Sequence, residues 1–209
     1  MFLKCIPAGA ISANCYVIVD EKTKEGAVID PGDFNRVVDN VIVASGIENL
    51  KYILCTHGHF DHISGVAALK NKYPEAEICA GKEDAPLLSS EKLNLAEYFG
   101  YSFEPCYCDK ELSHGDKLFL GETEITVFSA PGHSQGGVLY VVEDEKIVFT
   151  GDTLFSGGIG RTDMYGGDFP ILMKTLKKIK EFPEDFKIYP GHGGSSEIGY
   201  ELKTNIYLR

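Results

Sequence analysis

Four short, largely apolar runs in this chain each lead to a histidine or an aspartate, and this recurrence restricts how the chain can fold. The runs and the residues that follow them are 52–55 and His57, 125–128 and His133, 147–149 and Asp152, and 186–189 and His192. In the last three cases a glycine immediately precedes the polar residue and relaxes the backbone where strand becomes loop. Side chains presented from the carboxyl ends of sheet strands can converge on one cleft. The pattern therefore predicts a sheet protein whose strand ends share one polar site.

The densest of these segments reads His57-Gly58-His59-Phe60-Asp61-His62. Extended geometry at the strand end places His57 and His59 on the same side, because side chains in a strand repeat with a period of two. The chain then turns into a helix, which gives Asp61 and His62 a different direction. Imidazole and carboxylate ligands suit zinc, iron or manganese, so this one stretch can supply two ions.

Strand and helix patterns follow one another in two similar halves. The predicted strands are 2–6, 15–19, 27–29, 52–55, 77–80, 117–120, 124–128, 138–142, 146–150 and 186–189. Helical spacing of apolar residues predicts helices over 33–46 with Asp33 as the N-cap, over 63–73, and near 169–182. We therefore expect a layered α/β sandwich formed by a single domain over residues 1–209.

Composition excludes several classes of partner. The net charge of -11 repels phosphate backbones and anionic membranes, so we expect neither nucleic acid nor membrane as a partner. The chain has no export signal at its start and no apolar stretch of about 20 residues, which indicates a cytoplasmic protein. We interpret the six cysteines as reduced thiols, because most lie in apolar runs and none shows Cys-x-x-Cys spacing. The oligomeric state is left open.

The order of these motifs resembles the metallo-β-lactamase superfamily: His-x-His-x-Asp-His, then Gly-His, Gly-Asp and Pro-Gly-His-Gly. The resemblance runs from Asn14 to about Asn205 and implies a four-layer αββα sandwich with two divalent metal ions, zinc ahead of iron or manganese. The implied ligands are His57, His59 and His133 for the first metal, Asp61, His62 and His192 for the second, and Asp152 as a bridge between them. His114, the sixth histidine, matches no ligand position and is expected in a turn.

Within this superfamily, the chain is most similar to the short form of the glyoxalase II group. Its Gly160-Arg161-Thr162-Asp163 loop, followed by Gly166-Gly167-Asp168, matches that form. The long form adds a helical domain that grips glutathione and offers a tyrosine about where this chain has Asp163. The resemblance therefore implies the metal chemistry but not glutathione specificity. Asp152 stands where lactamases of the superfamily often have cysteine, which counts against antibiotic hydrolysis.

The implied reaction is hydrolysis of a small thioester, with S-lactoylglutathione as the candidate substrate. Two metal ions lower the pKa of a shared water, so that metal-bound hydroxide is available near neutrality, and one ion polarises the carbonyl. We expect Asp61 to accept a proton as well as bind metal. Arg161 is the candidate contact for an anionic end of the substrate, and Tyr165 is a candidate at the rim of the site.

Three alternatives stay open at this stage. A persulfide dioxygenase of the same group uses one iron held by two histidines and one aspartate. A nuclease of the superfamily is disfavoured, because such enzymes carry extra elements for nucleic acid and this chain is acidic. A non-enzymatic redox or metal-storage module would depend on the cysteines between Cys5 and Cys108 more than on the histidines.

Overall fold

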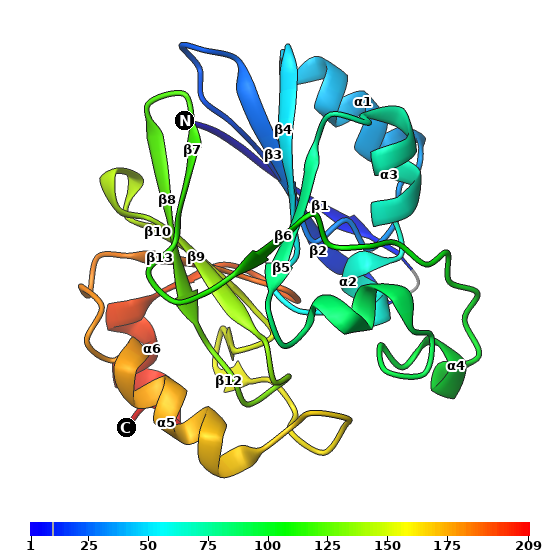
Figure 1. Ribbon diagram of the computed structural model, residues 1–209. Helices are drawn as coiled ribbons and strands as arrows, with labels where there is room; N and C mark the ends of the chain where they lie inside the picture. The colour runs from blue at the N-terminus through cyan, green and yellow to red at the C-terminus, as the bar shows by residue number, and fades with distance from the viewer. Residues whose placement is uncertain (10) are drawn as a thin grey trace.

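The computed structural model describes residues 1–9 and 11–209 and contains two six-stranded sheets packed face to face (Figure 1). In hydrogen-bonded order the first sheet consists of β1 (Phe2–Ala8), β2 (Ala13–Val19), β3 (Glu25–Ile29), β4 (Asn49–Leu54), β5 (Glu77–Gly81) and β6 (Lys110–Leu112). The second consists of β14 (Ser196–Glu197), β13 (Lys187–Pro190), β10 (Ile147–Gly151), β9 (Val138–Val142), β8 (Thr123–Ser129) and β7 (Lys117–Leu120). A small hairpin pairs β11 (Leu154–Phe155) with β12 (Gly158–Ile159).

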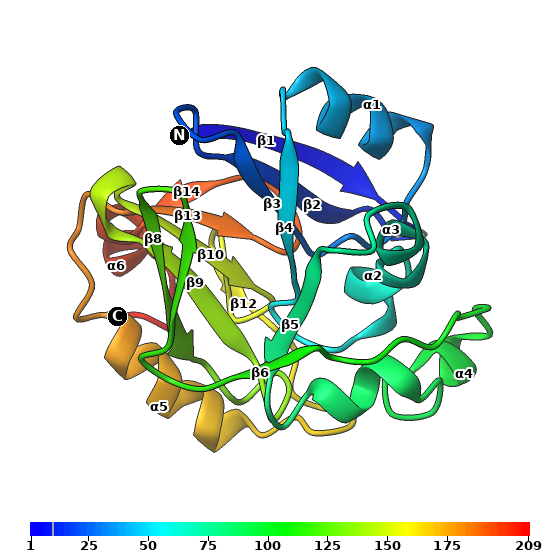
Figure 2. The same ribbon diagram turned by 45° about the horizontal axis from the view of Figure 1, so that its top comes forward.

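Helices cover the outer face of each sheet, which gives four layers (Figures 1 and 2). On the first sheet these are α1 (Arg36–Ala44), α2 (Phe60–Ile63) and α3 (Val66–Lys72), and on the second α5 (Phe169–Ile179) and α6 (Ile198–Thr204). The 3₁₀ turn η2 (Glu143–Glu145) joins β9 to β10. Residues 82–109, which we call the β5–β6 arm, carry the 3₁₀ turn η1 (Ala85–Ser89) and α4 (Ala96–Phe99). The expected αββα sandwich is confirmed.

Three apolar cores separate the four layers, and β2 shows how one strand serves two of them. Cys15 and Val17 point into the core beneath α1 and α3, whereas Tyr16 and Ile18 point into the core between the sheets. All of β2 is buried, because a strand covered on both faces needs apolar residues at odd and even positions. A third core lies between the second sheet and α5 and α6.

The two halves use the same sequence of connections. Each sheet begins with antiparallel neighbours, β1 to β3 in the first and β7 to β10 in the second. Each then continues through a helical crossover to a parallel neighbour, β4 after α1 and β13 after α5. Since parallel strands end at the same edge, this topology carries the polar segments after β4, β10 and β13 to one end of the molecule.

The helix boundaries differ from the sequence expectation in two places. The N-cap of α1 is Asn35, whose side chain accepts from the N–H groups of Val37 and Val38, and not Asp33, which binds the Asn35 amide instead. The single helix expected over 63–73 is two helices, α2 and α3. The break falls at Gly65, whose N–H donates to the Pro31 carbonyl in place of continuing the first helix.

In the part of the chain that the structure describes, no helix has both the length and the apolar character needed to cross a bilayer.

Two hydrogen bonds connect the sheets next to the histidine motif. The buried Tyr140 hydroxyl on β9 donates to the Cys55 carbonyl at 2.8 Å, just after β4. The N–H of Val138 donates to the Thr56 carbonyl, also at 2.8 Å. These contacts fix the end of β4, and with it the start of the motif at His57, relative to the second sheet.

We predict that Tyr140→Phe lowers the free energy of unfolding by about 1–2 kcal/mol, because the buried Cys55 carbonyl loses its hydrogen-bond donor. Denaturant unfolding followed by circular dichroism measures the change. Tyr107→Phe is the control, since Tyr107 is 77% exposed. Equal unfolding midpoints for the two variants would contradict the prediction.

Candidate metal centre

The seven side chains implied as ligands lie together at one end of the two sheets. They follow β4 (His57, His59, Asp61 and His62), β8 (His133), β10 (Asp152) and β13 (His192). All are buried except Asp152 and His192, which are partly exposed. Segments far apart in the sequence thus meet at a single polar cluster.

The cluster divides into two groups of three with Asp152 between them. The ligand atoms of each group lie within 4.8 Å of one another, and the groups are His57, His59 and His133, and Asp61, His62 and His192. Asp152 Oδ1 lies 3.4 Å from His62 Nε2, and Asp152 Oδ2 lies 3.7 Å from both His133 Nε2 and His192 Nε2. The geometry therefore provides two positions for cations and one carboxylate that reaches both.

Several buried atoms of this cluster have no partner, which tests whether metal ions fit here. His57 Nε2, His59 Nε2 and Asp152 Oδ1 are buried without a hydrogen bond. His59 Nδ1 faces His133 Nε2 at 2.9 Å, and two ring nitrogens facing each other repel unless a proton or a cation lies between them. Buried polar atoms without partners are costly. A donor set of imidazoles and carboxylates fits zinc, iron or manganese, so these residues suit two divalent ions.

The pKa values of four of these groups favour the forms that bind metal, whereas the neighbouring carboxylates raise the pKa values of His62 and His192, although burial works to lower them. Burial and the neighbouring imidazoles lower the pKa of His57 well below its usual range and that of His59 to about 3, so both rings are neutral. Burial works to raise the pKa of Asp61 and Asp152, but the surrounding histidines, His62 foremost, outweigh it and keep both carboxylates ionised. Neutral imidazole and ionised carboxylate are the ligand forms that metals require.

Asp30 orients two candidate ligands, His57 and His62, through their ring nitrogens that face away from the metal positions. The sequence pattern did not identify it. Its Oδ1 accepts from the Thr56 N–H at 2.7 Å, and its Oδ2 accepts from the Thr56 hydroxyl at 2.6 Å. The same Oδ2 lies 3.1 Å from His62 Nδ1, and the Thr56 hydroxyl lies 3.1 Å from His57 Nδ1. Such partners orient a ring so that its other nitrogen faces the metal. The available signal was that Asp30 follows a strand, as the ligands do.

Asp84, at the start of the β5–β6 arm, is a second carboxylate that the sequence did not reveal. It is fully buried, and burial raises its pKa. Its two oxygens accept from the N–H groups of Gly58 at 2.9 Å and Gly136 at 2.6 Å. Asp84 thereby ties the loop of His57 and His59 to the loop of His133. Gly58 allows the close approach, because a Cβ there would lie 2.5 Å from the Cβ of Leu87.

Arg161 contacts the site through its backbone and its side chain in different ways. Its carbonyl accepts from His133 Nδ1 at 2.7 Å and so orients that ring. Its guanidinium makes two hydrogen bonds to the Asp163 carboxylate, at 2.7 and 2.8 Å. Both side chains are more than half exposed. The Arg161 guanidinium, which is the candidate contact for a substrate anion, is therefore already paired with the Asp163 carboxylate.

A cleft of about 200 Å³ opens beside the cluster. One part of its lining is polar and consists of His59, Asp61, His133, Asp152, Arg161 and His192, and the remainder is apolar. Tyr165, the candidate at the rim, is 48% exposed and is not among the lining residues, whereas its neighbour Met164 is. Both groups of three candidate ligands contribute side chains to this lining.

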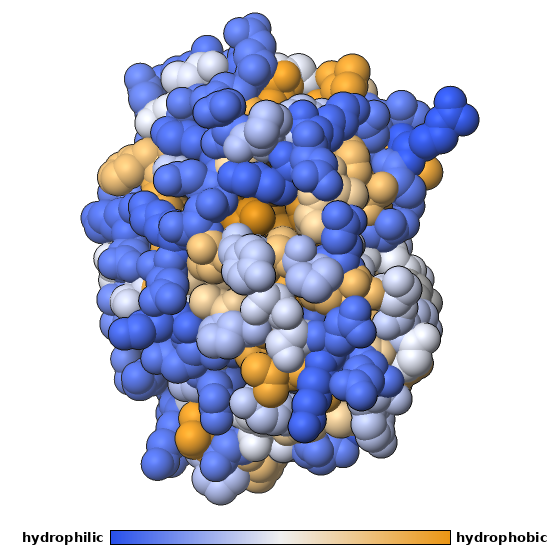
Figure 3. All heavy atoms as spheres, turned by 45° about the vertical axis from the view of Figure 1, so that its right-hand side comes forward, coloured by the Kyte–Doolittle hydropathy of each residue, from blue (hydrophilic) through white to orange (hydrophobic). Residues whose placement is uncertain are grey.

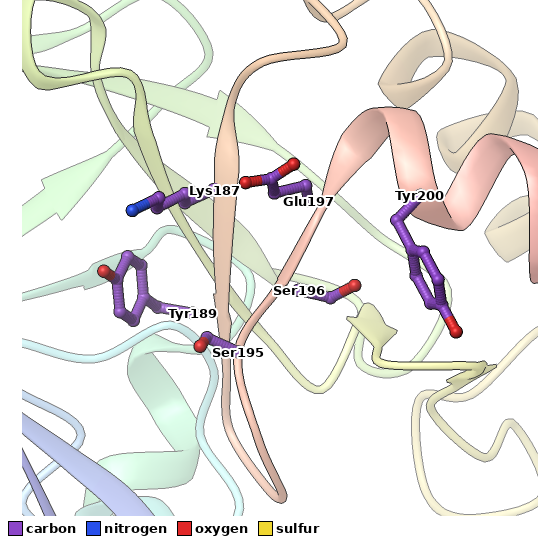
Figure 4. Close-up of a pocket in the computed structure, with 6 residues that line it drawn as sticks. All are labelled: Lys187, Tyr189, Ser195, Ser196, Glu197 and Tyr200. Carbon is purple, nitrogen blue, oxygen red and sulfur yellow. The ribbon is translucent and has the colours of Figure 1, made fainter.

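A larger hollow of about 340 Å³ lies between β13, β14 and α6 (Figure 4). It is lined by Lys187, Tyr189, Ser195, Ser196, Glu197 and Tyr200. No histidine or cysteine lines it, and only Glu197 could bind a metal. We therefore assign the functional site to the smaller cleft.

The remaining histidine and the cysteines lie outside the cluster. His114 is exposed in the turn before β7 and packs edge-on against Phe128. All six cysteines are free thiols. Burial raises the pKa of each, as for Cys15, Cys55 and Cys106, and so keeps the thiols protonated and weakly reactive. These environments do not favour the redox-module alternative.

Comparison with known proteins identifies the family of this architecture. A family model described as the metallo-beta-lactamase superfamily matches residues 8–192. Hydroxyacylglutathione hydrolase GloC of Haemophilus influenzae is 33% identical over 100% of this chain and 98% of its own length. The probable metallo-hydrolase YqgX of Bacillus subtilis is 30% identical over 97% of this chain and 95% of its own length.

One solved structure, that of the BLEG-1 B3 metallo-beta-lactamase, superposes with a TM-score of 0.92 at 33% identity over 99% of both chains. Another, TTHA1623 in a di-iron-bound form, gives a TM-score of 0.87 at 30% identity. It covers 98% of this chain and all of its own. The iron in that neighbour leaves the choice between zinc and iron open for this protein.

We predict that Asp152→Ala empties both metal positions, whereas His114→Ala leaves metal content unchanged, because only Asp152 reaches both groups of three. The fall in affinity should exceed the 10–100-fold typical for loss of an outer partner. Elemental analysis of the purified variants measures it. Equal metal loss in the two variants would show that the cluster is assigned wrongly.

Proposed function

Because this chain belongs to the metallo-beta-lactamase superfamily and is related to metal-dependent hydrolases, we propose that it hydrolyses a small thioester, with S-lactoylglutathione as the first substrate to test. The observation that carries the proposal is the position of Asp152 between two groups of three ligands at the floor of an open cleft. The choice of a thioester is supported by the full-length relative named hydroxyacylglutathione hydrolase.

The proposed roles follow from the positions of the side chains. When bound, two divalent cations would lower the pKa of a shared water and polarise the carbonyl of the substrate. His57, His59 and His133 would hold one cation, Asp61, His62 and His192 the other, and Asp152 would contact both. Asp61 lines the cleft and is ionised, which supports the proposal that one of its carboxylate oxygens accepts a proton from the attacking water.

Arg161 is the proposed contact for an anionic end of the substrate, in competition with Asp163. An exposed ion pair is weak, so a substrate carboxylate can displace Asp163 at little cost but also gains little. We therefore expect a modest contribution of Arg161 to recognition, smaller than that of an unpaired arginine in a dry cleft.

β-Lactam hydrolysis is the second candidate function, because a neighbour with a TM-score of 0.92 is titled a B3 metallo-beta-lactamase. The same cleft would present a lactam carbonyl to the two metal positions. Turnover of a chromogenic cephalosporin, measured beside the thioester, separates the two candidates.

We predict that a chelator abolishes thioester hydrolysis and that zinc, iron or manganese restores it, because the chemistry depends on the bound cations. Metal analysis of the active protein should give about two ions per chain. Full activity in metal-free protein would refute the mechanism. A single iron per chain together with oxygen uptake would identify a persulfide dioxygenase instead.

We predict that Arg161→Ala lowers kcat/KM for S-lactoylglutathione about two- to fivefold, and that Asp163→Asn raises it by a similar factor, since the latter frees the guanidinium. A neutral thioester of similar size should respond to neither change. Metal content should stay constant, because the backbone carbonyl of residue 161, not its side chain, holds His133. Equal effects on charged and neutral substrates would exclude charge recognition by Arg161.

A further inference from the structure

The apolar part of the cleft forms a wall beside the candidate metal centre. It consists of Ile11, Phe60, Leu95, Phe99 and Met164, which line the same space as the candidate ligands. On the side of the molecule that carries α4, apolar surface gathers in the middle of the face and hydrophilic residues surround it (Figure 3). Apolar surface inside a cleft marks the place where a ligand's apolar part is buried.

Leu95 stands in this wall in a conformation that a leucine rarely adopts. Its backbone is left-handed, with φ 74° and ψ 2°, which costs about 1–2 kcal/mol for a residue with a Cβ. Its neighbour Asn94 is fully buried, and the Asn94 side chain makes two hydrogen bonds. Its amide group donates to the Leu87 carbonyl, and its side-chain oxygen accepts from the Ala96 N–H. The surrounding structure thus fixes the Leu95 side chain in the wall despite the strain.

The arm that carries Leu95 and Phe99 is attached to the metal-binding motif. The Phe60 N–H, directly after His59, donates to the Asn94 carbonyl at 2.9 Å. The Phe60 ring packs against Phe99 and Tyr101, with ring centroids 5.7 and 4.8 Å apart. Phe99 is nevertheless 45% exposed, so part of this ring is free to be covered by a ligand.

The charge of the cleft points to the same kind of ligand. Among the residues described as lining it, Arg161 is the only lysine or arginine, and Asp163 already neutralises it. All other polar side chains of the lining belong to the candidate metal centre, where they would bind cations and not the substrate. Apart from Arg161 and the candidate metal ligands, what the lining offers to a substrate is therefore apolar contact.

We propose that Leu95 and Phe99 determine acyl specificity, by binding the aliphatic chain of an acyl group about four to six carbons long. The volume sets the upper limit of this length: at about 30 Å³ for each water-sized group, a 200 Å³ cleft holds at most about six such groups, and the reacting carbonyl takes up the space beside the candidate ligands. The inference rests on the proposed thioester hydrolysis and favours thioesters of short aliphatic acids, so that S-lactoylglutathione, whose acyl group has three carbons, would use the wall only in part.

The test uses metal-loaded protein and acetyl, butanoyl and hexanoyl thioesters of one neutral thiol, N-acetylcysteamine. The kcat/KM should rise along the series by up to about fourfold for each methylene that the wall covers. The matching S-alkyl thioethers, which cannot be hydrolysed, should show the same trend in affinity by isothermal titration calorimetry. Binding thus reports on the wall independently of turnover.

Phe99→Ala should flatten both trends, and Phe119→Ala is its matched control, because Phe119 is also 45% exposed but lies on β7. Leu95→Gly should flatten them as well, since glycine adopts the left-handed backbone without strain and removes only the side chain. Thioether affinity that is independent of chain length, or equal behaviour of Phe99→Ala and Phe119→Ala, would overturn the inference. Length-dependent binding without any thioester turnover would refute the proposed function and leave the apolar subsite standing.

Discussion

The gathering of imidazoles and carboxylates in one buried cluster is the constraint on which the rest of the structure depends. Ionisable groups are stable away from water only when opposite charges or cations compensate them. Asp61 and Asp152 provide the negative charge, and the histidines around them provide the ligands for positive charge. The cluster exists only if four strand ends from both sheets stop at the same place. The face-to-face packing, the parallel crossovers and the Tyr140 contact between the sheets all serve that requirement.

Much of the fold was predictable because its signals are local and periodic. The runs 15–19 and 52–55 are apolar at successive positions because both faces of these strands are covered, and both lie in or beside strands of the first sheet. The β5–β6 arm and α6 were not predicted. The helices of the arm are four or five residues long, too short to show helical periodicity, and they are held in place by contacts such as the hydrogen bond from the Phe60 N–H to the Asn94 carbonyl.

The candidate site likewise contains residues that could be predicted from the sequence and residues that could not. The histidines and aspartates at strand ends could be identified because residue type and spacing carry the information. Asp30 and Asp84 could not, because their roles depend on which backbone N–H groups and ring nitrogens come within reach after folding. The apolar wall of the cleft is harder still to predict from the sequence. Leucine and phenylalanine in a sequence indicate a core, and nothing local distinguishes a side chain that faces a cleft from one that faces another side chain.

Two segments of the β5–β6 arm have different roles. Its first residues, with Asp84, brace the loops that carry the candidate ligands, whereas residues 94–101 shape the cleft. The pairing of β5 with β6 at Cys79 and Lys110 closes the arm independently of its tip. The tip can therefore change in length and sequence without shifting the register of the sheet, provided that the hydrogen bond from the Phe60 N–H to the Asn94 carbonyl is kept. Because this segment shapes the cleft without setting the register of the sheet, residues 91–107 are the segment to graft when selectivity is to be redesigned.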